Sequence, residues 1–136
     1  MNIQLLPLRE EETIAFKEEM QEAFQQGFQA HFPNEEGNNQ WQVLPDKDFY
    51  QSLNAVGAEA YEALAADGQR VGGAIIVIKA DEHRGELAFL FVKVGVQSKG
   101  IGQTIWRAIE AMHPETDVWK TCTRYFDRRN ILYDYC

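Results

Sequence analysis

A glycine-containing segment joins an apolar run to an amphipathic one, and it reads Gln97-Ser98-Lys99-Gly100-Ile101-Gly102-Gln103-Thr104-Ile105-Trp106. The apolar run before it predicts a buried strand, and the spacing of Trp106, Ile109 and Met112 predicts one face of a helix. Glycine between a strand and a helix lets the backbone approach a ligand without interference from a Cβ atom. The first turn of the helix adds N–H groups without acceptors inside the helix, and the positive end of the helix dipole. The segment therefore predicts an anion site, best suited to a phosphate or pyrophosphate.

Two common phosphate-binding motifs do not fit this segment. The dinucleotide fingerprint G-x-G-x-x-G needs a third glycine where Ile105 stands. The P-loop pattern can begin with Gly95 and Gly100, but it then requires Lys-Ser/Thr, and the chain has Ile101-Gly102. What remains is Gln-x-x-Gly-x-Gly opening a helix behind an apolar strand. A strand-to-helix turn that binds no ligand is the alternative interpretation.

The remaining pattern resembles the acetyl-coenzyme A pyrophosphate loop of the GNAT family of N-acetyltransferases. Phe91-Val92 before the loop, Trp106 after it and Arg129-Asn130-Ile131 in the expected last helix extend the resemblance. It implies an α/β fold with a mixed sheet, and an N-acetyltransferase that moves an acetyl group from acetyl-CoA to a primary amine. Acetyl-CoA is the implied cosubstrate, and no metal is implied.

The resemblance also implies roles for individual residues. The N–H groups of residues 99–104 would hold the pyrophosphate, Phe91 and Val92 would offer backbone groups to the pantetheine arm and the thioester carbonyl, and Asn130 would hydrogen-bond the CoA arm. The expected cofactor-binding residues are Phe91, Val92, Gln97, Ser98, Lys99, Gly100, Ile101, Gly102, Gln103, Thr104 and Asn130.

Direct attack of an amine on a thioester requires alignment, a base for the ammonium proton and an acid for the departing thiolate. Glu86 is the nearest carboxylate on the strand before the loop, so it is the expected base; a solvated charge at a strand end is the alternative. The resemblance implies a tyrosine in the last helix as the acid. Tyr133 lies three residues after Asn130, on nearly the same helix face, and Tyr135 is its rival.

The whole chain predicts the element order β-α-α-β-β-β-α-β-α, a mixed sheet with helices on both faces. The expected elements are a strand over 3–8, helices over 10–31 and 46–56, strands over 58–66, 70–79 and 86–96, a helix to 112, a strand over 116–123 and a helix over 125–135. Asp67-Gly68 predicts a hairpin, and the β-branched run 71–78 predicts a central strand. Asp46 is a candidate helix N-cap. We expect one domain over residues 1–136 that lacks the last two strands usual in the family.

Composition excludes several classes of partner. Lys+Arg 13 against Asp+Glu 21 gives a net charge of −8, which argues against nucleic acid and anionic membranes and is compatible with a cationic substrate. Cys122 and Cys136 show no metal-like spacing and no disulfide framework, and the N-terminus shows no signal peptide. These features predict a cytoplasmic protein.

The sequence allows two functions other than acetyl transfer. An acyl-CoA-binding module with weak catalysis, acting through a protein partner, is the alternative function, and a purely structural domain is a third.

The loop 34–41 would border the acceptor pocket as a lid, or it is a solvated connector. The strand 116–123 exposes an apolar edge with Val118 and Trp119, which predicts a homodimer with C2 symmetry.

Overall fold

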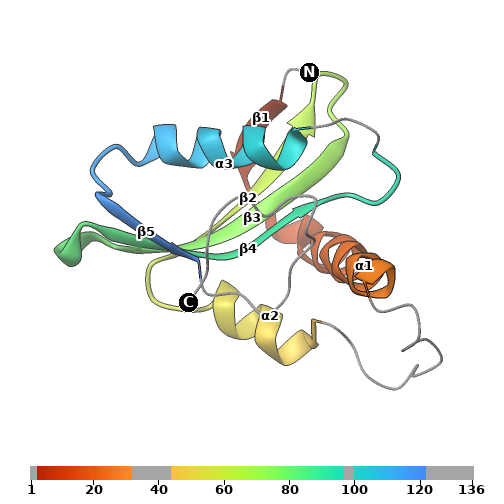
Figure 1. Cartoon of the computed structure of the whole chain (residues 1–136), viewed down its shortest axis with the longest axis horizontal. Coiled ribbons are helices and arrows are strands. Elements are labelled where there is room, and N and C mark those ends of the chain that lie inside the picture. The colour runs from red at the N-terminus through yellow and green to blue at the C-terminus, as the bar shows by residue number, and fades with distance from the viewer. Residues whose placement is uncertain (1–2, 32–43, 97–99, 122–136) are drawn as a thin grey trace.

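The computed structural model describes residues 3–31, 44–96 and 100–121, which form a five-stranded sheet with α-helices on both faces (Figure 1). The strands are β1 (Ile3–Pro7), β2 (Ala58–Ala65), β3 (Arg70–Lys79), β4 (Arg84–Val92) and β5 (Val118–Thr121), and the α-helices are α1 (Thr13–His31), α2 (Asp46–Leu53) and α3 (Ile101–Met112). The expected mixed α/β fold and the element order up to β5 are confirmed. The last helix, expected over 125–135, lies outside the described residues.

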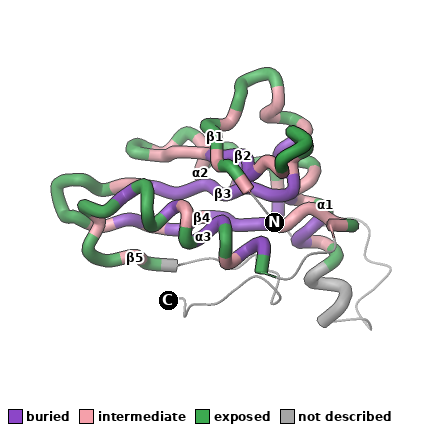
Figure 2. Tube along the Cα trace, turned by 90° about the horizontal axis from the view of Figure 1, so that it is seen from above, coloured by how far each residue is buried: buried purple, intermediate pink, exposed green. Residues whose placement is uncertain are grey.

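The strands are arranged in the order β1-β2-β3-β4-β5. The first four pair antiparallel, and β5 pairs parallel to β4. The hairpin between β2 and β3 is confirmed: Gly68 has φ 87°, and the Asp67 carboxylate accepts a hydrogen bond from the N–H of Gln69 at 3.0 Å. The run 71–78 lies in the middle strand, where residues from Val71 to Val77 are buried (Figure 2).

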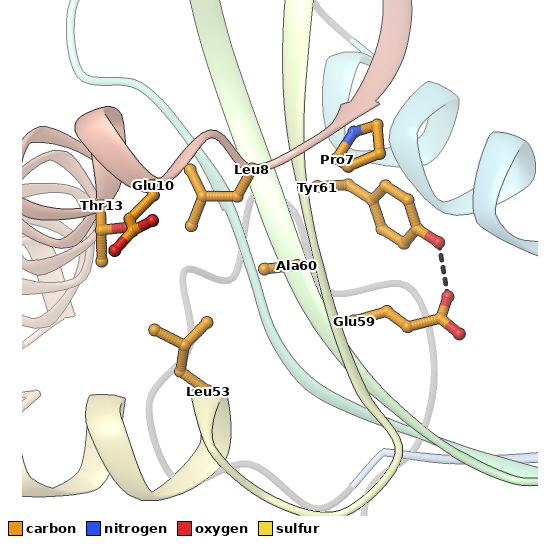
Figure 3. Close-up of a pocket in the computed structure, with 8 residues that line it drawn as sticks. All are labelled: Pro7, Leu8, Glu10, Thr13, Leu53, Glu59, Ala60 and Tyr61. Atoms are coloured by element: carbon orange, nitrogen blue, oxygen red, sulfur yellow. Dashed lines mark hydrogen bonds between the residues drawn. The ribbon is translucent and has the colours of Figure 1, made fainter.

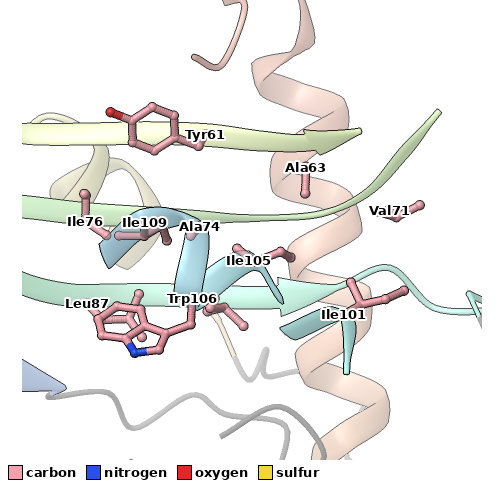
Figure 4. Packing of buried hydrophobic residues seen from close by; sticks show 11 residues of the cluster. Tyr61, Ala63, Val71, Ala74, Ile76, Leu87, Ile101, Ile105, Trp106 and Ile109 are labelled. Atoms are coloured by element: carbon pink, nitrogen blue, oxygen red, sulfur yellow. The ribbon is translucent and has the colours of Figure 1, made fainter. Parts of the chain in front are cut away.

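Each face of the sheet carries its own apolar core. On one face α3 places Ile101, Ile105, Trp106 and Ile109 against the sheet (Figure 4). On the other face α1 and α2 place Phe16, Met20, Phe24 and Phe49 against Ile75, Phe89 and Phe91. The apolar residues of α1 recur at three- and four-residue intervals, so that one side of the helix is buried. Among the described residues, no helix is long and apolar enough to cross a membrane.

Several element boundaries differ from the sequence-based expectation, and those around β4 and α2 differ most. Strand β4 ends at Val92 instead of continuing to residue 96. Asp46 is the first residue of α2, not its N-cap: Pro45 takes that position, and the Asp46 carboxylate binds Lys17 at 3.1 Å. Helix α2 ends at Leu53, and Val56 is 97% exposed. The chain turns at Gly57, which has φ 85° and lies so close to the carbonyl oxygen of Ile78 that a Cβ atom would collide with it.

A buried ion network fastens α1 to the sheet. Glu62 of β2 is fully buried and accepts hydrogen bonds from Arg9 at 3.0 Å and from Arg70 at 2.6 Å. Arg70 also donates to Glu19 of α1 at 2.8 Å and to Glu12 at 3.1 Å. Burial alone would raise the pKa of Glu62, but the hydrogen bonds from Arg9 and Arg70 outweigh it and hold that pKa below its ordinary value. The carboxylate is therefore charged in the folded chain.

Acid should weaken this network. A carboxyl group whose pKa is lower in the folded than in the unfolded chain stabilises the fold above the unfolded pKa, here 4.5, and this stability is lost as the pH falls through the folded pKa. We expect the free energy of unfolding to fall more steeply below about pH 4.5 for the parent than for Glu62→Gln, which has lost this proton linkage. Urea titrations of both proteins at several pH values measure the slopes. Parallel slopes would show that Glu62 contributes nothing to the acid sensitivity.

Candidate functional site

The start of α3 supplies backbone donors. Gly100 is exposed at the N-cap position with φ 84°, a left-handed conformation that favours glycine. A Cβ atom on it would meet no described heavy atom within 4 Å, so the space beside it is open. The N–H groups of Ile101, Gly102 and Gln103 follow, and an α-helix provides no internal acceptor for them. These three N–H groups are the donors that the predicted anion site would use.

Two details differ from the expected loop. The N–H of Thr104 donates to the carbonyl oxygen of Gly100 at 2.8 Å, so it closes the first helical turn instead of facing a ligand. Gly102 is buried inside α3, and the left-handed φ belongs to Gly100. Gln97, Ser98 and Lys99, also expected in this loop, lie outside the described residues.

The described pairing between β4 and β5 covers the first half of β4. The parallel register runs from Arg84↔Val118 to Leu87↔Thr121. At the same point the register with β3 shifts, because Ile75 pairs with Phe89 and Ile76 with Leu87, which leaves Ala88 as an extra residue. Such a bulge bends its strand and redirects the residues after it. Beyond Leu87, no described strand pairs with β4 on the β5 side.

The pairing with β3 decides which backbone groups of β4 face the β5 side. The N–H of Lys93 donates to Val71 of β3 at 2.8 Å. Because backbone groups alternate in direction along a strand, those of Phe91 turn toward β3, and those of Leu90 and Val92 turn away from it. The position of the Phe91 carbonyl oxygen agrees, since it would collide with a Cβ atom at Gly72 of β3. The backbone groups of Phe91, expected to face a ligand, therefore turn toward β3, and the backbone groups of Leu90 and Val92 turn to the other side.

Side chains hold this part of β4 in place from both faces. The Phe91 side chain is fully buried and packs edge-on against Phe16 of α1, with ring centroids 5.3 Å apart. Leu90 and Val92 pack in the cluster of α3. The glycine pair of β3 permits these approaches: a Cβ atom at Gly72 would lie 3.1 Å from Ile105, and one at Gly73 would collide with the Phe16 ring. The start of α3 and the second half of β4 are thus parts of one packed unit.

Glu86 lies on β4 just before the bulge. Its carboxylate forms an ion pair with Lys79 of β3 at 3.0 Å, and its side chain is 32% exposed. Because side chains alternate along a strand, Glu86 points to the face opposite Leu87, which is the face of α1 and α2. The carboxylate is thus accessible to water. Tyr133, its rival Tyr135, and Asn130 lie outside the described residues, as do the expected lid 34–41 and both cysteines.

Sequence reasoning missed the bulge at Ala88 and the Gly72-Gly73 pair. The glycine pair had a signal, because glycine inside a strand often marks a bulge or a close approach of another backbone. The bulge had none, since it depends on the register between β3 and β4. Among residues 3–31, 44–96 and 100–121, no group of three His, Cys, Asp or Glu side chains could hold a metal ion.

Comparison with known proteins places this geometry in context. The sequence profile described as "Acetyltransferase (GNAT) family" matches residues 13–130. The uncharacterized protein YrkN of Bacillus subtilis (strain 168) is 37% identical over 125 residues, which cover 92% of this chain and 65% of YrkN. The chain thus spans less than two thirds of that relative's length.

Two solved structures with a bound cofactor share the fold. A GNAT family acetyltransferase from Elizabethkingia anophelis with acetyl-CoA bound has a TM-score of 0.59 and 16% identity, over 90% of this chain and 64% of that one. The PaiA N-acetyltransferase from Thermoplasma acidophilum, in complex with coenzyme A, has a TM-score of 0.57 and 16% identity, over 89% and 79% of the two chains. At these identities the likeness concerns the fold alone.

Proposed function

Because the chain belongs to the GNAT acetyltransferase family, we propose that it transfers the acetyl group of acetyl-CoA to a primary amine by direct attack on the thioester. Family and fold support acyl transfer in general. The observation that carries the finer proposal is the edge of β4 that turns away from β3, where the backbone groups of Leu90 and Val92 lie beside the start of α3. Acetyl-CoA bound along this edge would have donors for its thioester carbonyl from β4 and donors for its phosphates from α3.

In this proposal the first turn of α3 binds the CoA pyrophosphate. The N–H groups of Ile101, Gly102 and Gln103 and the helix dipole favour two negative phosphates, and Gly100 leaves room for them. Gln97, Ser98 and Lys99 complete the loop, and Asn130 holds the CoA arm. Acetyl-CoA supplies the activated acetyl group when it is bound.

The edge of β4 that turns away from β3 would stabilise the transition state. When the amine attacks, the thioester oxygen becomes an oxyanion, and the N–H of Leu90 is the first outward-facing donor after the bulge. A donor placed in advance at such an oxygen contributes roughly 3–4 kcal/mol in other enzymes. The backbone of Val92 would hydrogen-bond the pantetheine arm.

Glu86 and Tyr133 are the proposed base and acid. Glu86 and Leu90 are four residues apart, about 13 Å along an extended strand, so a chain of water molecules would carry the proton from the amine to the carboxylate. Tyr133 would give its proton to the CoA thiolate. Positioning of a neutral amine supplies much of the remaining acceleration.

Turnover with a panel of primary amines tests the proposal. We expect free CoA thiol to accumulate, and the acetylated amine to appear by mass spectrometry, when the protein meets acetyl-CoA and a suitable acceptor. Binding of acetyl-CoA without thiol release by any amine would favour the acyl-CoA-binding module instead. Absence of acetyl-CoA binding in calorimetry would favour a structural domain.

Substitution of Gly102 tests the anion site. Gly102→Val should weaken acetyl-CoA binding roughly tenfold or more, because a branched Cβ atom in the buried first turn of α3 would displace the donors from the phosphates. Ala111→Val, at an exposed position near the other end of α3, is the matched control and should bind as the parent does. Calorimetry gives both affinities. Equal affinity of the Gly102 variant and the control for acetyl-CoA would show that the pyrophosphate does not bind at this turn.

The partners remain predictions. We propose an amine acceptor that is a small molecule or a peptide, a cytoplasmic location and a homodimer. The charge of −8 favours a cationic acceptor over nucleic acid.

A further inference from the structure

The Phe16 ring of α1 packs on the sheet where β4 turns backbone groups away from β3. It meets the Phe91 ring edge-on, with centroids 5.3 Å apart, and a Cβ atom at Gly73 would collide with it. The register pairs Gly73 with Phe91, so one ring covers a pair of residues on two neighbouring strands. Phe91 stands between Leu90 and Val92, whose backbone groups the proposed acetyl transfer uses. The position of Phe16 therefore bears directly on both groups.

Arg70 of β3 fixes where Phe16 meets the sheet. Its guanidinium donates to Glu12 at 3.1 Å and to Glu19 at 2.8 Å, which lie four residues before and three residues after Phe16. The guanidinium carbon also lies 6.0 Å from the centroid of the Phe16 ring, at the limit of a cation–π contact. Because Arg70 holds the chain on both sides of Phe16, it sets the height and the rotation of α1 at this ring.

Apolar packing alone leaves the start of α1 incompletely supported. An open pocket of about 470 Å³ lies there, with Thr13 of α1 on one side and Leu8, Leu53 and Ala60 around it (Figure 3). A side chain beside such a space gains fewer van der Waals contacts than one in a filled core. The placement of this end of α1 therefore depends strongly on the ion pairs of Arg70.

We propose that Phe16 is a positioning residue for acetyl transfer and that Arg70 aligns it through Glu12 and Glu19. Phe16 is fully buried, so this role, which rests on the proposed function, is exerted through β4 and not by contact with acetyl-CoA or the amine. A misplacement of about 1 Å at a group that orients a reacting atom can lower a rate roughly 100-fold. Loss of the ring would let this part of β4 move toward α1.

Phe16→Leu tests the role in catalysis, because leucine is apolar but has no ring to support Phe91. We expect kcat to fall roughly 10- to 100-fold, since the N–H of Leu90 would leave the position of the developing oxyanion. Acetyl-CoA affinity should stay within about threefold of the parent value, because the phosphate donors belong to α3 on the other face of the sheet. Steady-state kinetics and calorimetry measure the two quantities.

Phe24→Leu is the matched control, about two turns later in α1. Phe24 is as deeply buried as Phe16, and its ring meets Phe89, which precedes both outward-facing residues of β4, at a centroid distance of 6.2 Å. The two variants thus remove the same atoms from the same apolar core. The kcat of the control should change less than about threefold.

Amide hydrogen exchange, followed by NMR, tests the position of β4 without turnover. The N–H of Lys93 donates to Val71 at 2.8 Å just beyond the supported part of β4, and the N–H of Ile78 donates to a carbonyl oxygen at 2.9 Å near the other end of β3. A variant that only lowers global stability gives Lys93 no larger acceleration of exchange than Ile78. Phe16→Leu should accelerate exchange at Lys93 roughly tenfold more than at Ile78, and Phe24→Leu should not.

Arg70→Lys tests the alignment separately, and it also decides the result if Phe16→Leu does not fold. Lysine keeps the positive charge but has no planar fork to hold three carboxylates together. We expect a larger acceleration of exchange at Lys93 than at Ile78, and a fall in kcat of roughly tenfold. Arg84→Lys, at an arginine that is 39% exposed, is the matched control and should change neither quantity.

Several outcomes would overturn this role. Equal acceleration at Lys93 and Ile78 in folded Phe16→Leu, or in Arg70→Lys, would show a loss of global stability only. A parent-like kcat in folded Phe16→Leu, or an equal loss of kcat in Phe24→Leu, would also reject it. Absence of turnover in the parent would instead reject the proposed function, and the exchange rates would still decide whether Phe16 holds this part of β4.

Discussion

Replacement of Arg70 by methionine is expected to lower the free energy of unfolding by about 3–5 kcal/mol, because it breaks a buried ion network from one side. The Arg70 side chain is 7% exposed and donates to three carboxylates, those of Glu12, Glu19 and Glu62. Without it, Glu62 remains fully buried with Arg9 as its remaining cationic partner among the described residues. Three carboxylates then repel one another where one guanidinium held them together.

Chemical denaturation measures this effect against a matched control. Arg84→Met removes an arginine that is 39% exposed and makes one ion pair, at 3.4 Å with Glu82; it should cost less than about 1 kcal/mol. Arg70→Met combined with Glu62→Leu should recover part of the loss, because the buried charge is then removed as well. A loss no larger for Arg70→Met than for Arg84→Met would contradict the assigned role.

The second large effect concerns catalysis by Glu86. Glu86→Gln should lower kcat by about 100-fold or more, since general bases contribute roughly 10²–10⁴-fold and glutamine cannot accept the proton. Acetyl-CoA affinity should stay nearly unchanged, because the proposed cofactor contacts lie after the bulge and in α3. Steady-state kinetics and calorimetry separate the two quantities.

Glu82→Gln is the control for this variant. Glu82 is exposed and lies in the turn before β4, so its substitution changes the net charge equally without touching the proposed site. Its kcat should match that of the parent. If Glu86→Gln also retained the parent kcat, the Glu86 side chain would have the alternative role, a charge paired with Lys79 at the surface.

Local signals in the sequence predicted most of the fold. Asp67-Gly68 and the apolar run 71–78 identified the hairpin and the central strand, because turn chemistry and hydrophobic patterning act over a few neighbouring residues. The glycine segment before Trp106 identified the start of α3 for the same reason. The sequence did not identify which backbone groups of β4 turn away from β3. That these are the groups of Leu90 and Val92 depends on the register with β3, which no local pattern contains.

Long-range contacts explain the remaining differences. Arg70 meets Glu19, which is 51 residues away, and Glu12, which is 58 residues away. Nothing in the spacing of these charges distinguishes a buried network from a solvated surface. The shift at Ala88 likewise results from how two strands align.

The spatial order of the strands also has a consequence for how the chain folds. Each described strand lies beside the next one in sequence, from β1 to β5, so the sheet can form by successive addition, with none of these five strands inserted between two others. The meander β2-β3-β4 has the shortest loops, and its closure costs the least chain entropy. Strand β1 joins across α1 and α2, and β5 joins across α3, so both edges close larger loops. The meander thus offers a nucleus to which the helices and the two edges are added.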